Sequence, residues 1–157
     1  MKKDKILLIL KRILFYFLSF TWGSITSIIG LLLFTIPLCT THKIHCWHGR
    51  LYGVMPKCFG GGYGFEMGCF WFVAYNCDEY DNKQSTFMGH EAGHGIQNII
   101  FGPFQLVLVQ IPSMIRYWYR EIKYDRKNKR PPTAYDDIWF EGWATALGKK
   151  YILTDRL

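Results

Sequence analysis

An uncharged, apolar run near the start of the chain places the strongest constraint on its fold. Residues 13–37 read ILFYFLSFTWGSITSIIGLLLFTIP and contain no charged side chain. A helix of this length extends about 37 Å, enough to cross the hydrocarbon core of a bilayer with some tilt. The run is too long for the apolar core of a signal peptide, and no small-x-small cleavage site follows it. The sequence therefore predicts a transmembrane helix that is retained as a membrane anchor over residues 1–38.

The distribution of charge also indicates a membrane. The 157-residue chain has a formal net charge of +7, and its basic residues gather before the apolar run and between residues 116 and 130. Both groups flank apolar sequence, which is typical of cations at an anionic lipid surface. No known nucleic-acid-binding module is present. We expect membrane lipid as a partner, no nucleic acid, and a single-pass location in a cell membrane; the sequence gives no oligomeric state.

The rest of the chain predicts an α+β domain after a short connector. Residues 39–60 are rich in Cys, His and Gly and are expected to be a connector, and residues 61–157 form the domain. Its expected elements follow in chain order. They are a β-hairpin over 63–66 and 70–75, a helix capped by Ser85 or Thr86 and ending near Gly102 and Pro103, an apolar segment over 104–122 interrupted by Pro112, a basic loop over 123–137, and a final helix opened near Asp136 or Asp137.

The most specific chemical pattern in the chain is HExxH, formed by His90, Glu91 and His94. On a helix, positions i and i+4 lie about 40° apart around the axis and one turn apart along it, so both imidazoles can reach one ion. Glu91 lies about 100° from His90 and is placed to contact a water at that ion rather than the ion itself. The pattern therefore predicts a Zn²⁺ site in which two histidines bind metal and a carboxylate accepts a proton from water.

Two glycines flank the second histidine and add to this prediction. The motif fixes only three positions, and chance would produce it in about one of two hundred shuffled chains of this composition. Gly93 and Gly95 each cost about 1 kcal/mol relative to alanine inside a helix, so we expect them where a metal or substrate excludes side-chain bulk. The alternative is a pair of histidines satisfied on a core or interface face.

A catalytic zinc ion needs a third protein ligand and one open position. Asp136 or Asp137 could supply it, although both also suit helix capping, and so could His45 or Cys46 in the CTTHKIHCWH cluster. We favour Glu141, because it lies among bulky aromatic residues in WFEGWATALG and an acidic side chain there is costly to desolvate without a cation.

These pieces resemble the zincin metallopeptidases, specifically the gluzincin type, in which a glutamate on a later helix completes HExxH. They are still more similar to a group of small bacterial membrane proteins with a hydrophobic start, a Gly-rich hairpin, HExGHxxQ, a GP segment ending in PS, and a late E-x-W-A. The corresponding stretches here are GGGYGFEMGCFWFVAY, HEAGHGIQ, FGPFQLVLVQIPS and FEGWA, which cover most of residues 60–148. The resemblance implies a minimal zincin-like domain in the bacterial inner membrane, with His90, His94 and Glu141 as zinc ligands and Glu91 as general base.

One position departs from the pattern of that family. In such helices an aspartate often follows the glutamate ligand by four residues and holds a histidine in orientation, but this chain has Thr145 there. Groups of this kind change metal affinity and activity by one or two orders of magnitude, so we expect weakened or altered activity. Gln97, on the same helix face as the histidines, either orients a ligand or is an ordinary polar residue, and we favour the second interpretation.

The third ligand also constrains the path of the chain. If Glu141 shares a metal with the two histidines, residues 96–115 cannot cross the membrane once between them. Its apolar part, residues 101–115, is short and carries Gln105, Gln110 and two prolines, so we expect it to be interfacial or re-entrant. The basic residues from Arg116 onward would then meet lipid headgroups.

The function predicted from the sequence is that of a membrane-anchored, zinc-dependent hydrolase, foremost a metallopeptidase. Strand 70–75 would offer its edge to an extended peptide or protein substrate. A first alternative is a membrane protein with a structural metal site that acts as an interaction or accessory module. A second alternative is a small membrane protein without a metal.

Overall fold

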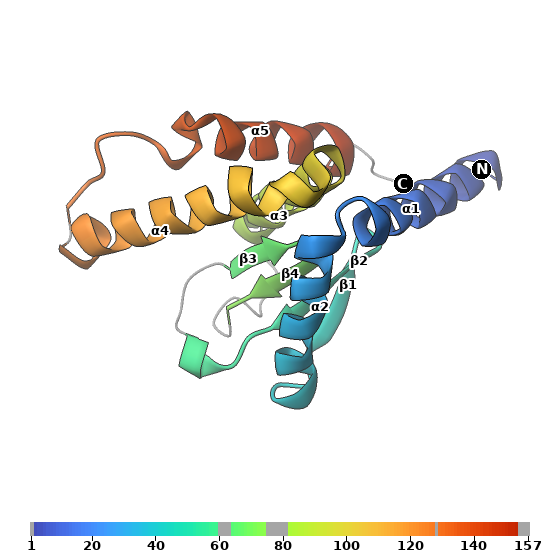
Figure 1. Ribbon diagram of the computed structural model, residues 1–157, viewed down its shortest axis with the longest axis horizontal. Helices are drawn as coiled ribbons and strands as arrows, with labels where there is room; N and C mark the ends of the chain where they lie inside the picture. Colours follow the sequence, from blue (N-terminus) through green and yellow to red (C-terminus); the bar gives the residue numbers. More distant parts are fainter. Residues whose placement is uncertain (1, 60–63, 75–81, 128, 154–157) are drawn as a thin grey trace.

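The computed structural model describes residues 2–59, 64–74, 82–127 and 129–153 and shows an α+β fold in which helices surround one small sheet (Figure 1). The predicted α+β class is confirmed. The main elements are α1 (Lys2–Thr21), α2 (Ser24–Cys39), β1 (Ile44–Trp47), β2 (Arg50–Val54), β3 (Gly64–Met67), β4 (Phe70–Val73), α3 (Asn82–Phe101), α4 (Ile111–Lys123) and α5 (Trp139–Gly148).

The apolar run of residues 13–37 does not form one helix. α1 ends at Thr21, α2 begins at Ser24, and the two helices are bent by 98° relative to each other. At the bend, a Cβ atom on Gly23 would lie 2.5 Å from the side chain of Asn98 in α3, so only glycine allows this approach. Asn98 also hydrogen-bonds the side chains of Thr26 and Ser27. The prediction of a single helix here is therefore wrong, because polar contacts with α3 select a sharp turn.

None of the helices in the described part of the chain is by itself both long and apolar enough to cross a bilayer. Two consecutive pairs meet the requirement of length and composition jointly, but each pair is sharply bent. They are Lys3–Thr21 with Ser24–Cys39, at 98°, and Phe87–Phe104 with Leu106–Lys123, at 118°.

The sheet has the strand order β1-β2-β4-β3. β4 pairs with β3 in antiparallel and with β2 in parallel orientation, so it is an inner strand and all four of its residues are buried. Phe72 packs in a cluster with Phe15 and Phe34 of the first two helices, whereas Trp71 packs with Met88 and Ala92 of α3. The sheet is thus covered on both faces, as expected for a strand without apolar–polar alternation.

The predicted β-hairpin is present as β3 and β4, although Tyr63 and Tyr75 lie outside the described residues. Its turn is formed by Gly68 and Cys69, because Met67 pairs with Phe70. The expectation that strand 70–75 offers a free edge is wrong, since β3 and β1 are the edge strands.

Residues 39–60 are more than a connector. They form β1 and β2, an antiparallel hairpin that belongs to the same sheet. His48 and Gly49 at its turn have φ angles of 47° and 75°, which is the geometry of the two-residue turns that favour hairpins. A domain boundary at residue 60 would therefore divide the sheet.

The ends of the later helices agree with the sequence more closely than their starts. α3 ends at Phe101, before Gly102 with φ +57° and Pro103, as predicted. It begins at Asn82, however, so Ser85 and Thr86 lie inside the helix and cannot be its cap. Pro112 lies in the first turn of α4, where a missing N–H costs no helical bond, so it does not interrupt that helix.

Short helical turns complete the described chain. A 3-10 turn at Gly102–Phe104 and a π-helical turn at Leu106–Gln110 link α3 to α4. The basic loop after α4 is largely irregular, and its 3-10 turn Tyr135–Asp137 leads into α5, where Asp137 accepts a hydrogen bond from the Ala134 N–H at 2.8 Å. Further such turns are Lys57–Phe59, Asp125–Lys127 and the π-helical Lys149–Leu153.

Candidate metal centre

The close crossing of α3 and α5 builds the site. A Cβ atom on Gly93 would lie 1.9 Å from the carbonyl oxygen of Ala144, and one on Gly148 would lie 1.8 Å from that of Gly89. Backbone therefore meets backbone at this crossing, and Glu141 on α5 comes to lie opposite the two histidines of α3. Gly93 is therefore needed for the packing of α3 against α5. This corrects the expectation that the glycine leaves room for a metal or substrate.

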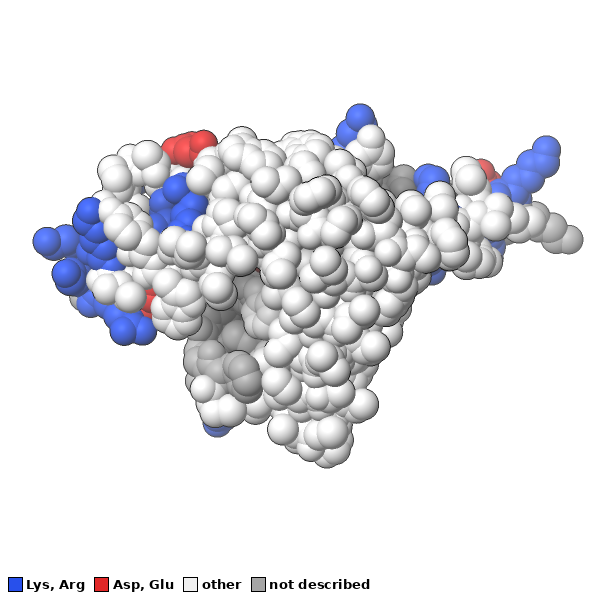
Figure 2. Space-filling model, viewed as in Figure 1, with Lys and Arg blue, Asp and Glu red and all other residues white. Residues whose placement is uncertain are grey.

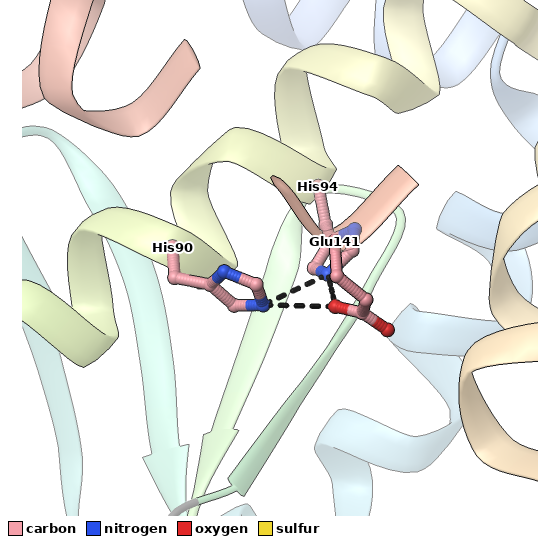
Figure 3. Close-up of side chains that lie close together, drawn as sticks. All are labelled: His90, His94 and Glu141. Atoms are coloured by element: carbon pink, nitrogen blue, oxygen red, sulfur yellow. Dashed lines mark hydrogen bonds and ion pairs between the residues drawn. The ribbon is translucent and has the colours of Figure 1, made fainter. Parts of the chain in front are cut away.

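The structure brings the three residues predicted as metal ligands together (Figure 3). One carboxylate oxygen of Glu141, Oε2, lies 3.1 Å from Nε2 of His90 and 3.1 Å from Nε2 of His94. The two Nε2 atoms are 3.2 Å apart. Within the described ranges, this is the one cluster of three or more His, Cys, Asp or Glu side chains placed to hold a metal ion.

Gln97 fixes the orientation of His94. Its amide nitrogen donates to the carbonyl oxygen of Phe140 at 2.7 Å, so its Oε1 atom faces Nδ1 of His94 at 2.8 Å. Oε1 can only accept, and His94 must therefore carry its proton on Nδ1, which leaves the Nε2 lone pair directed at the site. Gln97 is fully buried and orients His94, contrary to the interpretation favoured from the sequence.

Thr145 and Asp136 do the same for His90. The Thr145 hydroxyl donates to Oδ2 of Asp136 at 2.9 Å, and its Oγ1 atom lies 2.7 Å from Nδ1 of His90. Because that hydroxyl proton is already engaged, Oγ1 accepts the Nδ1 proton of His90. Asp136 does not join the cluster; it accepts the hydrogen bond of Thr145 instead. Thr145 and Asp136 together therefore take the place of the aspartate that often follows the glutamate by four residues in the resembling family.

Glu141 supplies a buried negative charge. Its side chain is fully buried, and its second oxygen, Oε1, accepts a hydrogen bond from the Ser113 hydroxyl at 2.5 Å. Burial raises the pKa of Glu141, but hydrogen bonds with His90, His94 and Ser113 outweigh it and hold this pKa well below its ordinary value. Those hydrogen bonds from the histidines need a proton on Nε2; when neither imidazole carries one there, the two nitrogen lone pairs and the carboxylate oxygen repel each other unless a cation lies between them.

Glu91 lies on the side of the site that faces the sheet. Its carboxylate is buried and accepts a hydrogen bond from the backbone N–H of Glu66 in β3. Burial raises the pKa of Glu91, while His90 and His94 lower it, and the net shift is upward. A carboxylate with a raised pKa is suited to accept and release a proton near neutral pH.

Glu66 and Arg50 are two further buried ionisable residues near Glu91, and neither was predicted from the sequence to belong to the site. Glu66 is buried, and its Oε2 atom accepts a hydrogen bond from the Gln110 amide at 2.8 Å. Burial and the nearby Glu91 charge raise the pKa of Glu66 well above its ordinary value. Arg50 donates to the carbonyl oxygen of Ala92 at 2.9 Å, and burial lowers its pKa to about 10. The only sequence signal was an acidic residue inside an aromatic strand.

Tyr135 is another residue near the site that sequence reasoning missed. Its ring centroid lies 6.3 Å from that of His90, and its hydroxyl group is close enough to Ser113 and Glu141 for both to affect its pKa. Burial and the charge of Glu141 raise the pKa of Tyr135, so the phenol stays neutral and can donate.

The remaining predicted ligands do not join the site. His45 lies in β1 with its ring stacked on Tyr52 at 5.0 Å, and Cys46 is exposed on the same edge strand. Neither belongs to a cluster that could hold a metal ion among the described residues. The Asp137 carboxylate accepts a hydrogen bond from the Ala134 N–H.

Comparison with models of protein families, with curated proteins and with solved structures finds no significant match to this chain. The resemblance to zincin metallopeptidases therefore stays a prediction. The function proposed below therefore rests on the geometry of His90, His94 and Glu141.

Proposed function

We propose that this protein is a membrane-anchored, zinc-dependent hydrolase, foremost a metallopeptidase with a minimal zincin-like domain. The observation that supports it most is the convergence of Nε2 of His90, Nε2 of His94 and Oε2 of Glu141 within 3.1–3.2 Å of each other. Two imidazoles and one carboxylate form a set of protein ligands typical of catalytic zinc sites, which keep one further position open.

The roles of the protein groups follow from this arrangement. When bound, zinc would supply a Lewis acid and lower the pKa of a water molecule. Glu91 would accept the proton of that water, and the Glu66 N–H keeps its carboxylate in place. Tyr135, neutral and close to His90, would donate a hydrogen bond to the oxyanion that develops on a carbonyl substrate.

The edge strand β3 suits an extended peptide substrate. It lies at the end of the sheet, and its Glu66 N–H already points away from β4 towards Glu91. A peptide that pairs with this strand would therefore run close to the proposed general base.

Exposed apolar side chains support the membrane anchor. Ile13 and Phe17 in α1 and Leu32 in α2 each expose more than half of their surface. Exposed apolar side chains that gather on a helix are typical of contact with lipid or another protein. We propose that the bent α1–α2 pair anchors the protein at a bacterial inner membrane.

Exchange of Glu91 for glutamine tests the proposal. We expect Glu91→Gln to keep one equivalent of zinc, because Glu91 is not a ligand, and to lose hydrolysis of a fluorogenic peptide library by at least about 100-fold. Glu121→Gln, a change of a surface carboxylate on α4, serves as control and should keep both properties. If Glu91→Gln keeps zinc and also hydrolyses the library at the wild-type rate, catalysis by this site is excluded.

One observation favours a structural metal site in an interaction module. Glu141 is fully buried and His94 is 5% exposed, whereas catalytic sites need access for substrate. Under this alternative, zinc removal by a chelator unfolds the protein, and Glu91→Gln changes neither zinc content nor the effect of the protein on its cell. A metal content below about a tenth of an equivalent in purified protein would exclude both functions.

A further inference from the structure

The outer face of α4 is an exposed apolar stripe. No residue of this helix is buried, and Ile111, Met114, Ile115, Trp118 and Ile122 all expose large parts of their side chains. Their spacing of three, four and seven residues places them on one side of a helix. The preceding π-helical turn extends the stripe with Val107 and Leu108. We call these seven residues the apolar stripe.

The inner face of the same helix holds the metal centre and the loop beside it. Ser113 donates to Glu141, and Arg116 donates to the carbonyl oxygens of Ala134 at 2.9 Å and Tyr135 at 3.2 Å. Arg120 donates to the carbonyl oxygen of Thr133 at 2.9 Å. These polar residues also follow helical spacing, so α4 separates the exposed stripe from the site by the width of one helix.

Basic residues border the apolar stripe at its far end. Lys127, Lys129 and Arg130 are exposed just after α4. Figure 2 shows Lys and Arg gathered around this end and at the start of α1, whereas the middle of that face is almost free of charge. An apolar helix face next to cations is complementary to a bilayer surface with anionic headgroups, where each cation contributes about 1 kcal/mol.

We propose that the apolar stripe lies in the surface of an anionic lipid bilayer, and that this contact strengthens metal binding by fixing Ser113 against Glu141. α4 would lie along the bilayer surface. The inference rests on the metal site of the proposed function but not on hydrolysis, so it can fail or hold independently of catalysis.

The coupling has a physical basis in how α4 is held. With no buried side chain of its own, the helix is fixed to the body of the protein mainly by polar bonds from Ser113, Arg116 and Arg120. Lipid would cover its apolar face and favour the docked position. Because linkage is reciprocal, the state that binds lipid better also binds metal better. A residue such as Ser113, which hydrogen-bonds a metal ligand, changes the metal affinity by about tenfold or more.

Quenching of Trp118 tests the lipid contact directly. The full chain is placed in vesicles of phosphatidylcholine with about one-third phosphatidylglycerol, with acyl chains brominated close to the headgroups. We expect Trp118→Phe to lower the fraction of tryptophan emission that these lipids quench. Trp71→Phe is the matched control, because Trp71 is 1% exposed and its Nε1 atom finds no hydrogen-bond partner among the described residues. That change should raise the quenched fraction.

An unchanged quenched fraction in Trp118→Phe would overturn the lipid contact, and so would cross-linking of the stripe to a second copy of the chain in the same vesicles. Equal quenching in pure phosphatidylcholine vesicles would overturn the role of the anionic headgroups.

Zinc affinity in the same vesicles tests the coupling. We expect Ile115→Glu, which places a charge in the apolar stripe, to bind zinc about tenfold more weakly than wild type. Tyr151→Glu, which alters an exposed aromatic residue beyond α5, should bind like wild type. In a Ser113→Ala background, Ile115→Glu should have no further effect. If Ile115→Glu binds zinc normally, or weakens it equally in that background, coupling through Ser113 is wrong. Hydrolysis is not measured in any of these assays.

Discussion

The Nδ1 atom of His90 lies 2.7 Å from the Oγ1 atom of Thr145, a residue 55 positions later in the chain. The hydroxyl of Thr145 donates its hydrogen bond to Asp136, so this contact fixes which nitrogen of His90 is free for a metal. The departure from the expected aspartate therefore preserves the orientation of His90 and moves the negative charge one residue further away.

Exchange of Thr145 tests this contact. We expect Thr145→Val to bind zinc about 10- to 100-fold more weakly, because valine has a similar shape but cannot accept the Nδ1 proton. Thr145→Ser keeps the hydroxyl and should stay within about threefold of wild type. Competition with a chromophoric chelator measures both affinities. Equal affinity of the valine and serine variants would show that His90 needs no partner at Nδ1.

Gln97 offers a similar test at the other histidine. Gln97→Leu leaves both Nδ1 of His94 and the carbonyl oxygen of Phe140 without their partners, so we expect a loss of about 1–3 kcal/mol in the free energy of unfolding. Zinc affinity should fall by about tenfold as well.

A neighbouring glutamine separates these two effects. Gln105 is also fully buried, but its amide reaches only the carbonyl oxygen of His94, at 3.4 Å. Gln105→Leu should therefore lower stability without changing zinc affinity. Comparable losses of zinc affinity in the two variants would mean that general destabilisation, not orientation of the imidazole, explains the effect of Gln97.

Gly93→Ala distinguishes helix propensity from helix packing. In an open helix this change would stabilise by about 1 kcal/mol. Here the new Cβ atom would lie 1.9 Å from the carbonyl oxygen of Ala144, so we expect α5 to be displaced, with loss of zinc binding and a lower unfolding temperature. Ala146→Gly on the exposed face of α5 is the control for propensity alone and should keep zinc binding. A Gly93→Ala protein with raised stability and full zinc content would disprove the close crossing.

Local patterns in the sequence were sufficient for much of the candidate site. HExxH needs only helical spacing to bring His90 and His94 together, and an acidic residue among aromatic side chains identified Glu141. The hairpin of β3 and β4 and the end of α3 at Gly102 also follow from nearby residues.

The features that the sequence did not predict depend on contacts between distant residues. The bend at Gly23 is stabilised by Asn98, which hydrogen-bonds Thr26 across 72 residues of chain. Arg50 enters the core because it can reach the carbonyl oxygen of Ala92, 42 residues away. A long apolar run has the same composition whether it forms one helix or two, so only the partner on α3 decides between them.

Glu66 provides a prediction of pH dependence away from the metal ligands. Its pKa is raised in the folded protein above the ordinary value of 4.5, by burial and by the charge of Glu91. From about pH 4.5 upward to the raised value, the folded state therefore holds a proton that the unfolded state has lost, and stability must fall as the pH increases.

Replacement of Glu66 by glutamine should remove this part of the pH dependence, because glutamine resembles the protonated acid and still accepts the hydrogen bond from Gln110. We expect Glu66→Gln to match wild type near pH 4.5 and to exceed its unfolding temperature increasingly at higher pH, with both proteins measured in chelator. Glu121→Gln, at a partly exposed carboxylate 3.5 Å from Arg126, should follow the wild-type curve. A Glu66→Gln protein that loses stability relative to wild type as the pH rises would show instead that Glu66 is ionised and stabilises Arg50 by its charge.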